Sequence, residues 1–183
     1  MGYKITVKQG NLVEEEADFI VNASNTKLLL GSGVSMAFKK HCKIKLQKEM
    51  NNLILQHPKE LVQGDVVLTS SGDASNFKYA LHALVMNYNK GVRGVSKNPS
   101  LETIQTILEN IFLFLNNFVK KNKKVKIVLP LLGCGVGGLN KNDLLTLYKT
   151  FFLKDILFEC EVVVYGYTLE DYNLIKKTLI SSN

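Results

Sequence analysis

The chain has 183 residues, of which 46% are hydrophobic and 21% are charged, and its formal net charge is +7. No apolar run approaches the roughly 20 residues that span a bilayer, and the alternating N-terminus lacks the apolar stretch of a signal peptide. We therefore expect one domain over residues 1–183, located in the cytoplasm and without a membrane partner.

Apolar periodicity predicts strands and helices that alternate along the chain. In chain order we expect strand 3–9, strand 19–21, a helix that follows Gly33 and runs through Phe38, helix 45–56, strand 65–69, strand 79–85, a helix capped by Ser100, strand 125–132, helix 140–153, strand 161–167 and a closing helix capped at 168–171. Asn22–Asn25 falls in the loop after the second strand, and residues 87–99 form a polar loop. With neither internal repeats nor a linker, this order indicates an α/β fold, a single three-layer α/β/α sandwich with a mixed central sheet.

Two glycine-rich segments, Gly31–Val34 and Gly133–Gly138, each adjoin an apolar run. Glycine lets backbone N–H groups approach and wrap a phosphate, so the pair predicts a cradle for a diphosphate and a nucleotide-like ligand. The second segment matches G-x-G-x-x-G, but it lies near the C-terminal end instead of in a first strand–helix turn, and Asp155 falls around a helix end. No Gly-Lys-Ser/Thr follows either segment, which also argues against a P-loop ATPase.

The cysteines and histidines give no metal-ligand or disulfide pattern. The three cysteines are an odd number without C-x-x-C spacing, and no histidine pairs locally with an acidic residue. We therefore predict no disulfide framework, no metal and no cofactor. Backbone amides around Cys134 would lower the pKa of its thiol, but we favour its interpretation as a small residue that fits the loop.

The positive charge leaves two interpretations open. Four lysines lie within residues 120–124, and such a run either solvates a helix end or attracts nucleic acid. Arg93 is the only arginine, and no aromatic residue interleaves with the run. We favour the solvated helix end, and nucleic acid stays a partner that charge alone supports.

Six short segments carry a resemblance to a known family. They are VKQGNL at 7–12, ADFIVNASN at 17–25, GSGV at 31–34, GDVVLT at 64–69, LHA at 81–83 and PLLGCGVGG at 130–138. In this order and spacing they resemble a macro domain, the ADP-ribose-binding α/β/α module, from about residue 3 to residue 180. The resemblance implies ADP-ribose or an ADP-ribosylated macromolecule as the partner.

The resemblance also implies a role for each motif. Backbone amides at a helix N-terminus would come from Gly31, Ser32, Gly33 and Val34. The residues that would close over the pyrophosphate and border the distal ribose are Gly133, Cys134, Gly135, Val136 and Gly137. Asn22 and Asn25 would lie on the intervening loop, where Asn25, the catalytic candidate, would bond the distal ribose and orient a reacting group. The alternative for Asn25 is a turn asparagine that bonds its own backbone.

At the adenine end, the resemblance implies contacts from both termini of the domain. Asn11 and Leu12 follow the first strand, and Tyr167, which would stack on adenine, ends the last one; Tyr165 is the alternative stacking residue. The family usually has an aspartate where this chain has Asn11. An amide oxygen still accepts a hydrogen bond from the adenine amine, but without charge assistance the bond is weaker.

Two further departures from the family pattern bear on catalysis. Ser35 stands where the hydrolytic branch has an aspartate that helps to position water, and serine is no general base near neutral pH. Another branch uses a loop lysine as a nucleophile, and Lys90 is the only candidate here, although we favour a solvated loop lysine. His82 receives no catalytic role. The resemblance thus implies ADP-ribose binding with slow hydrolysis of ADP-ribose 1''-phosphate or an ADP-ribosyl adduct; the alternative is a reader module without catalysis.

Overall fold

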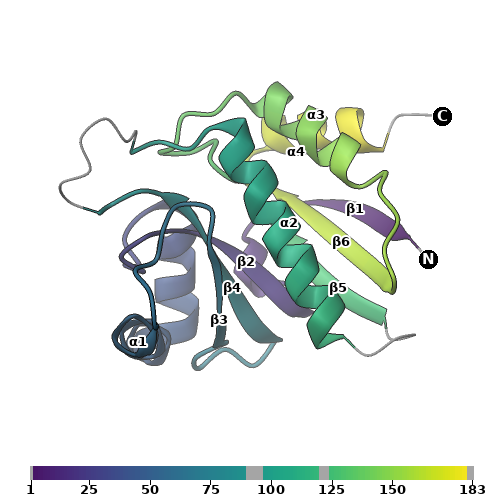
Figure 1. The fold of residues 1–183 in the computed structure, drawn as a ribbon. Helices are drawn as coiled ribbons and strands as arrows, with labels where there is room; N and C mark the ends of the chain where they lie inside the picture. The colour runs from purple at the N-terminus through teal and green to yellow at the C-terminus, as the bar shows by residue number, and fades with distance from the viewer. Residues whose placement is uncertain (1, 90–96, 120–123, 181–183) are drawn as a thin grey trace.

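The computed structural model describes residues 2–89, 97–119 and 124–180. Within these ranges six strands form one sheet in the order β1-β6-β5-β2-β4-β3 (Figure 1). The strands are β1 (Tyr3–Gln9), β2 (Ala17–Asn25), β3 (Val66–Ser70), β4 (Phe77–Met86), β5 (Lys124–Leu129) and β6 (Glu159–Gly166). Neighbouring strands are parallel except for β3, which pairs antiparallel with β4. The predicted mixed sheet is therefore confirmed.

Helices cover both faces of this sheet (Figure 1). They are α1 (Gly33–Gln56), α2 (Leu101–Phe118), α3 (Lys141–Phe151) and α4 (Leu169–Leu179), with a short 3-10 turn, η1, at Leu12–Glu14. Alternate residues of each strand face opposite ways: Val162 and Val164 pack in the core beneath α2, α3 and α4, whereas Val163 packs in the core beneath α1. This is the predicted three-layer α/β/α arrangement. None of the described helices has the length and apolar content to cross a membrane.

Helix caps form where the sequence places them. Ser100 accepts a hydrogen bond from the backbone N–H of Thr103, and Thr168 accepts one from that of Asp171; both are capping boxes. Asn140 caps α3 through the N–H groups of residues 142 and 143. These caps satisfy N–H groups that a helix start otherwise leaves without a partner.

Two element boundaries differ from the prediction by more than two residues. β2 continues through Asn25, so Asn22 and Asn25 lie on the strand and not in a loop, because β4 pairs with it along its whole length as far as a bulge at residues 24 and 25. β5 ends at Leu129, before the predicted end at residue 132, because Pro130 has no N–H to donate and the chain then turns, with Cys134 N–H bonded to the Leu131 carbonyl.

The two helices predicted around residues 33–56 are two segments of α1 that meet at a sharp kink. Lys43 has φ 60° and ψ −165°, outside helical values. At the kink, the N–H of Asp73 donates to the Cys42 carbonyl at 3.1 Å. Gly72, with φ +65°, sits so close that an added Cβ would lie 2.6 Å from the same carbonyl oxygen. The loop at 71–73 therefore holds the kink through a backbone contact that only glycine permits.

We expect Gly72→Ala to lower the free energy of unfolding by about 1–3 kcal/mol, because it adds both a steric clash and a strained φ. Urea unfolding of the variant and the wild type measures the change. Gly31→Ala is the control, since a Cβ there meets no atom within 4 Å. Equal stability of Gly72→Ala and the wild type would contradict this account of the kink.

Candidate ligand-binding site

The two glycine-rich segments meet at one cavity of about 320 Å³ at the end of the sheet. Its lining consists of Ala23, Ser24, Asn25, Leu29, Gly31, Ser32, Gly33, Val34, Ser35, Val85, Met86, Tyr88, Leu131, Gly133, Gly135, Val136 and Gly137. The structure thus brings together most of the site residues that the sequence indicated. Five of the predicted site residues do not belong to the lining: Asn11, Leu12, Asn22, Cys134 and Tyr167.

The first wall of the cavity is the start of α1. The Ser32 carbonyl accepts the N–H of Met36, so the N–H groups of the three residues between them have no helical acceptor. The Ser32 side chain makes no capping bond, and the first turn carries no acidic residue. These N–H groups and the helix dipole make this wall favourable for an anion.

The second wall is the loop that follows β5. Gly133 and Gly138 have φ of +78° and +72°, and the loop is closed by the bonds from Gly138 N–H to the Gly135 carbonyl and from Leu139 N–H to the Gly133 carbonyl. The N–H groups of residues 135–137 donate to no described residue. A Cβ on Gly137 would lie 2.6 Å from the Gly133 carbonyl oxygen, whereas one on Gly135 would meet only open space. The loop therefore presents main-chain donors, and Gly135 faces free volume.

Asn25 lines the cavity and also shapes its own loop. Its Oδ1 accepts the N–H groups of Lys27 (3.1 Å) and Leu29 (3.3 Å), and its Nδ2 donates to the Leu29 carbonyl (3.0 Å). These bonds hold a turn in which Leu28 has φ 50°. The structure thus contains the turn in which the Asn25 side chain bonds to its own loop backbone. One of the two N–H groups of its side-chain amide remains for a ligand.

Asn22 is fully buried and forms part of a polar chain that crosses the sheet. Its Nδ2 lies 3.1 Å from His82 Nδ1, and its Oδ1 accepts the Ser35 hydroxyl at 3.0 Å. His82 Nε2 lies 2.8 Å from Thr69 Oγ1, which in turn donates to the Ser70 carbonyl. Burial lowers the pKa of His82 to about 3, so the ring is neutral, with Nε2–H as donor and Nδ1 as acceptor. Asn22 therefore fixes Ser35, at the start of α1, and does not reach the cavity itself.

The predicted adenine-end residues lie at another junction. Gly10 N–H bonds to the Gly166 carbonyl at 3.0 Å, which places the segment after β1 beside the end of β6. Asn11 donates to Glu14 Oε1 at 3.1 Å, and the Leu12 side chain is buried in the core beneath α1. Tyr167 is 80% exposed. The structure leaves its ring open to a ligand.

The remaining predictions concern Cys134, the basic residues and a metal site. Burial raises the pKa of the Cys134 thiol to about 11, so the interpretation as a small residue that fits the loop agrees with its surroundings. Lys90, Arg93 and residues 120–123 of the lysine run lie outside the described residues. Among the described residues, no group of His, Cys, Asp and Glu is arranged to hold a metal ion.

Sequence reasoning missed Val85, Met86, Tyr88, Leu29 and Leu131 as lining residues. A signal for the first three was available, because Val85 ends the predicted strand at 79–85 and Met86 and Tyr88 follow it. Parallel strands that neighbour each other end at the same edge of a sheet, where ligands bind. The sequence does not say that β4 is the neighbour of β2. Leu29 and Leu131 carry no polar group and no motif that marks them.

A family model described as "Macro domain" matches residues 21–147. The chain belongs to the macro domain family. This macro domain is 29% identical over 188 residues to a protein of Sulfolobus acidocaldarius, covering 99% of this chain and 93% of that protein. Its fold is similar to the Oceanobacillus iheyensis macrodomain with ADP (TM-score 0.77, 19% identity, covering 96% of this chain and 89% of that one). It is also similar to the Trypanosoma brucei macrodomain in complex with ADP-ribose (TM-score 0.75, 17% identity, covering 94% and 68%).

In this macro domain the segment that carries Asn11 and Leu12 is anchored by one carboxylate. Glu15 is only 7% exposed and bonds to Lys8 (2.8 Å), Lys126 (2.6 Å) and the Tyr165 hydroxyl (2.5 Å). Burial alone would raise the pKa of Glu15, but the hydrogen bonds from Lys126, Lys8 and Tyr165 outweigh it and lower the pKa to about 2. The Tyr165 hydroxyl is occupied by its hydrogen bond to Glu15.

Because the folded-state pKa of Glu15 lies below its ordinary value of 4.5, its contribution to stability is present above pH 4.5 and is lost as the pH falls toward 2. We expect Glu15→Gln to be less stable than the wild type at pH 7, with the difference shrinking between pH 4.5 and 2. Urea unfolding across this range measures it, with the exposed neighbour Glu16→Gln as control. A difference that stays constant with pH would refute the role of the carboxylate charge.

Proposed function

We propose that this macro domain binds ADP-ribose, free or attached to a macromolecule, with its diphosphate between the start of α1 and the loop at 133–138. The observation that carries the proposal is the convergence on one cavity of main-chain N–H groups from both segments, none of which donates to a described residue. The described lining contains no carboxylate that would repel an anion. The similar macrodomain structures from Oceanobacillus iheyensis and Trypanosoma brucei contain ADP and ADP-ribose, respectively, which supports the same assignment.

The adenine lies, in this proposal, at the junction of β1 and β6. Tyr167 is exposed there, and base–aromatic stacking contributes about 1–3 kcal/mol. Tyr165 is the weaker candidate because Glu15 holds its hydroxyl. Asn11 offers an amide to the adenine amine and Leu12 its backbone, provided that Asn11 exchanges its present bond to Glu14 for one to the base.

The distal ribose lies at Asn25, whose remaining N–H is available to a hydroxyl group. We infer that turnover of ADP-ribose 1''-phosphate or of an ADP-ribosyl adduct is slow. The described lining residues include no carboxylate, imidazole, ammonium or thiol that would act as a base or nucleophile, and the hydroxyl of Ser35 is committed to Asn22 and the Ala23 carbonyl. Positioning by Asn25 and electrostatic stabilisation by backbone amides are the contributions that remain.

Calorimetry with ADP-ribose tests the binding proposal. We expect the wild type to bind and Gly135→Glu to lose affinity, because a carboxylate in this loop repels the diphosphate. A repulsion of about 2 kcal/mol corresponds to about thirtyfold in affinity. Gly2→Glu is the matched control, since it adds the same charge at another glycine with open space around it. Absence of wild-type binding at millimolar ligand rejects the proposal, and unchanged binding by Gly135→Glu rejects the position of the diphosphate.

Product analysis with ADP-ribose 1''-phosphate and with ADP-ribosylated protein tests turnover. We expect slow release of product and, with ADP-ribosylated protein as substrate, a rate without an inflection between pH 6 and 8, because the described lining contains no carboxylate, imidazole, ammonium or thiol. Lys90→Ala should leave the rate unchanged. Fast turnover that Lys90→Ala abolishes would overturn the inference, and no product after long incubation would establish a reader without catalysis.

A further inference from the structure

The charge of the chain is concentrated in one stretch beside the cavity. No acidic residue occurs between Asp18 and Glu49, a stretch that contains the first cavity loop and the first half of α1. It carries six lysines, at positions 27, 39, 40, 43, 45 and 48, against a net charge of +7 for the whole chain. The remaining charges of the chain therefore nearly balance one another.

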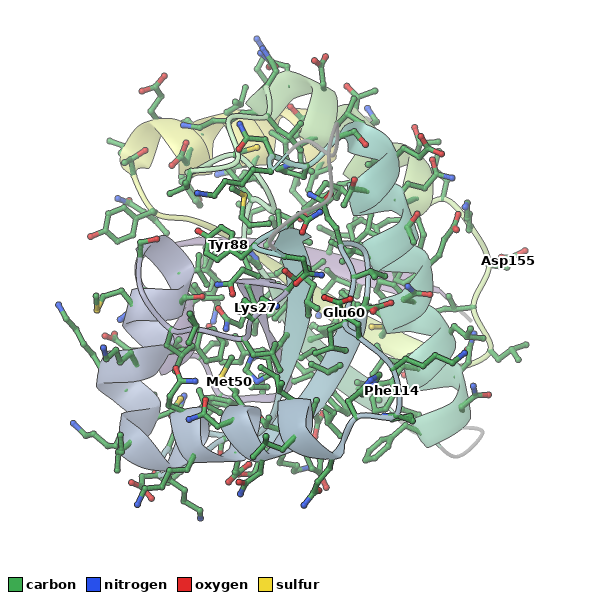
Figure 2. All side chains as sticks on the ribbon, turned by 60° about the vertical axis from the view of Figure 1, so that its left-hand side comes forward. Lys27, Met50, Glu60, Tyr88, Phe114 and Asp155 are labelled. Carbon is green, nitrogen blue, oxygen red and sulfur yellow. The ribbon has the colours of Figure 1, made fainter. Side chains whose placement is uncertain are left out.

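All six lysines are exposed, and none of their ammonium groups forms an ion pair or hydrogen bond with a described residue. Figure 2 shows nitrogen-tipped side chains that reach into solvent from both segments of α1. Glu49 bonds to the backbone and hydroxyl of Ser70, and Asp73, at the kink, lies within 4.0 Å of none of these ammonium groups.

We propose that the α1 lysine surface, defined by Lys39, Lys40, Lys43, Lys45 and Lys48, binds the phosphate backbone of a double-stranded nucleic acid. The kink at Lys43 turns the helix, so the five ammonium groups are spread along two directions and not along one helical stripe. Their charge suits a polyanion with phosphates at regular intervals, which a protein neutralises with lysine and arginine.

The chemistry of this surface favours a duplex over other polyanions. Of the two rings on α1, Phe38 is fully buried, and His41 is half-buried with its ring stacked on Phe77 and its Nε2 bonded to Asn76. The surface therefore offers no free ring on which an unpaired base could stack. It carries no arginine, tyrosine or tryptophan, the residues on which protein–protein interfaces depend. Ile44 is its one large exposed apolar side chain among the described residues, whereas a helix that lies in a membrane surface needs a continuous apolar face.

The surface is next to the cavity but does not form part of it. Lys39 lies six residues beyond Gly33, which corresponds to about 9 Å along a helix axis, and none of the five lysines lines the cavity. Nucleic-acid binding is therefore separable from ADP-ribose binding, and the experiment below uses no ADP-ribose for its primary readout.

The test is fluorescence anisotropy with a labelled 20-base-pair DNA duplex of arbitrary sequence, titrated with the full chain over 50–200 mM salt. Three proteins are compared: the wild type, the variant Lys39→Glu/Lys40→Glu/Lys45→Glu, and the charge-matched control Lys4→Glu/Lys124→Glu/Lys177→Glu. The control lysines are exposed and lie on β1, β5 and α4. Both triple variants change the net charge equally, so they differ only in where the charge is altered. ADP-ribose calorimetry on the triple variants checks that they keep a folded cavity.

We expect the wild type to bind regardless of duplex sequence, with an affinity that falls steeply with salt. The α1 variant should lose at least about tenfold in affinity, with a salt slope shallower by about three, one for each phosphate contact removed. The control should lose less than about threefold. Equal losses in both variants would show that net charge and not this surface is responsible, and would overturn the proposal. So would the absence of duplex binding, or stronger binding to vesicles of anionic lipid than to the duplex.

Discussion

The buried hydrogen-bond chain from Thr69 through His82 and Asn22 to Ser35 is the interaction on which the site depends. It links β3, β4 and β2 to the first turn of α1. Each member must have one defined role: a neutral His82 accepts from the Asn22 amide, so the amide oxygen points to Ser35. A buried polar chain that is fully satisfied specifies one arrangement, because leaving any member unpaired costs about 1–3 kcal/mol. The unbonded N–H groups of α1 therefore have a fixed position relative to the sheet.

The opposite wall is positioned by steric exclusion and not by polar side chains. A Cβ on Gly137 would lie 2.6 Å from the Gly133 carbonyl oxygen, and Gly133 has a φ of +78°, which residues with a side chain rarely adopt. The loop is held in a shape that leaves the N–H groups of residues 135–137 without an acceptor among the described residues. Because both walls offer backbone N–H groups, the proposed anion site needs no charged side chain, and the described lining contains none. The same design that suits diphosphate binding leaves the described lining without a general base.

The sequence predicted the elements well because each carries a local signal. The capping boxes at Ser100 and Thr168 and the continuous apolar run of β5 are determined by neighbouring residues. The kink in α1 is different, because the distant loop at 71–73 holds it. The direction of Asn22 was not predictable, since it depends on His82, 60 positions away, in a strand whose pairing partner the sequence does not specify. The same reason explains the extension of β2, which exists because β4 pairs with it. The two glycine motifs indicated a shared ligand, but only the strand order β5-β2-β4 shows why their loops meet.

Groups that attract an anion lie at two distances from the cavity, at the start of α1 and farther along that helix. The amide N–H groups and the dipole at the start of α1 act within the cavity, where a ligand excludes water and screening is weak. The lysines farther along α1 lie at about the Debye length of 8 Å or beyond it, so salt screens most of their effect on a small ligand in the cavity. A polymer whose phosphates lie directly on those lysines is closer to them than the Debye length, so salt screens the attraction less. In the two proposals, the first set of donors therefore governs the affinity for a diphosphate, and the second set governs the attraction of a nucleic acid to this side of the domain.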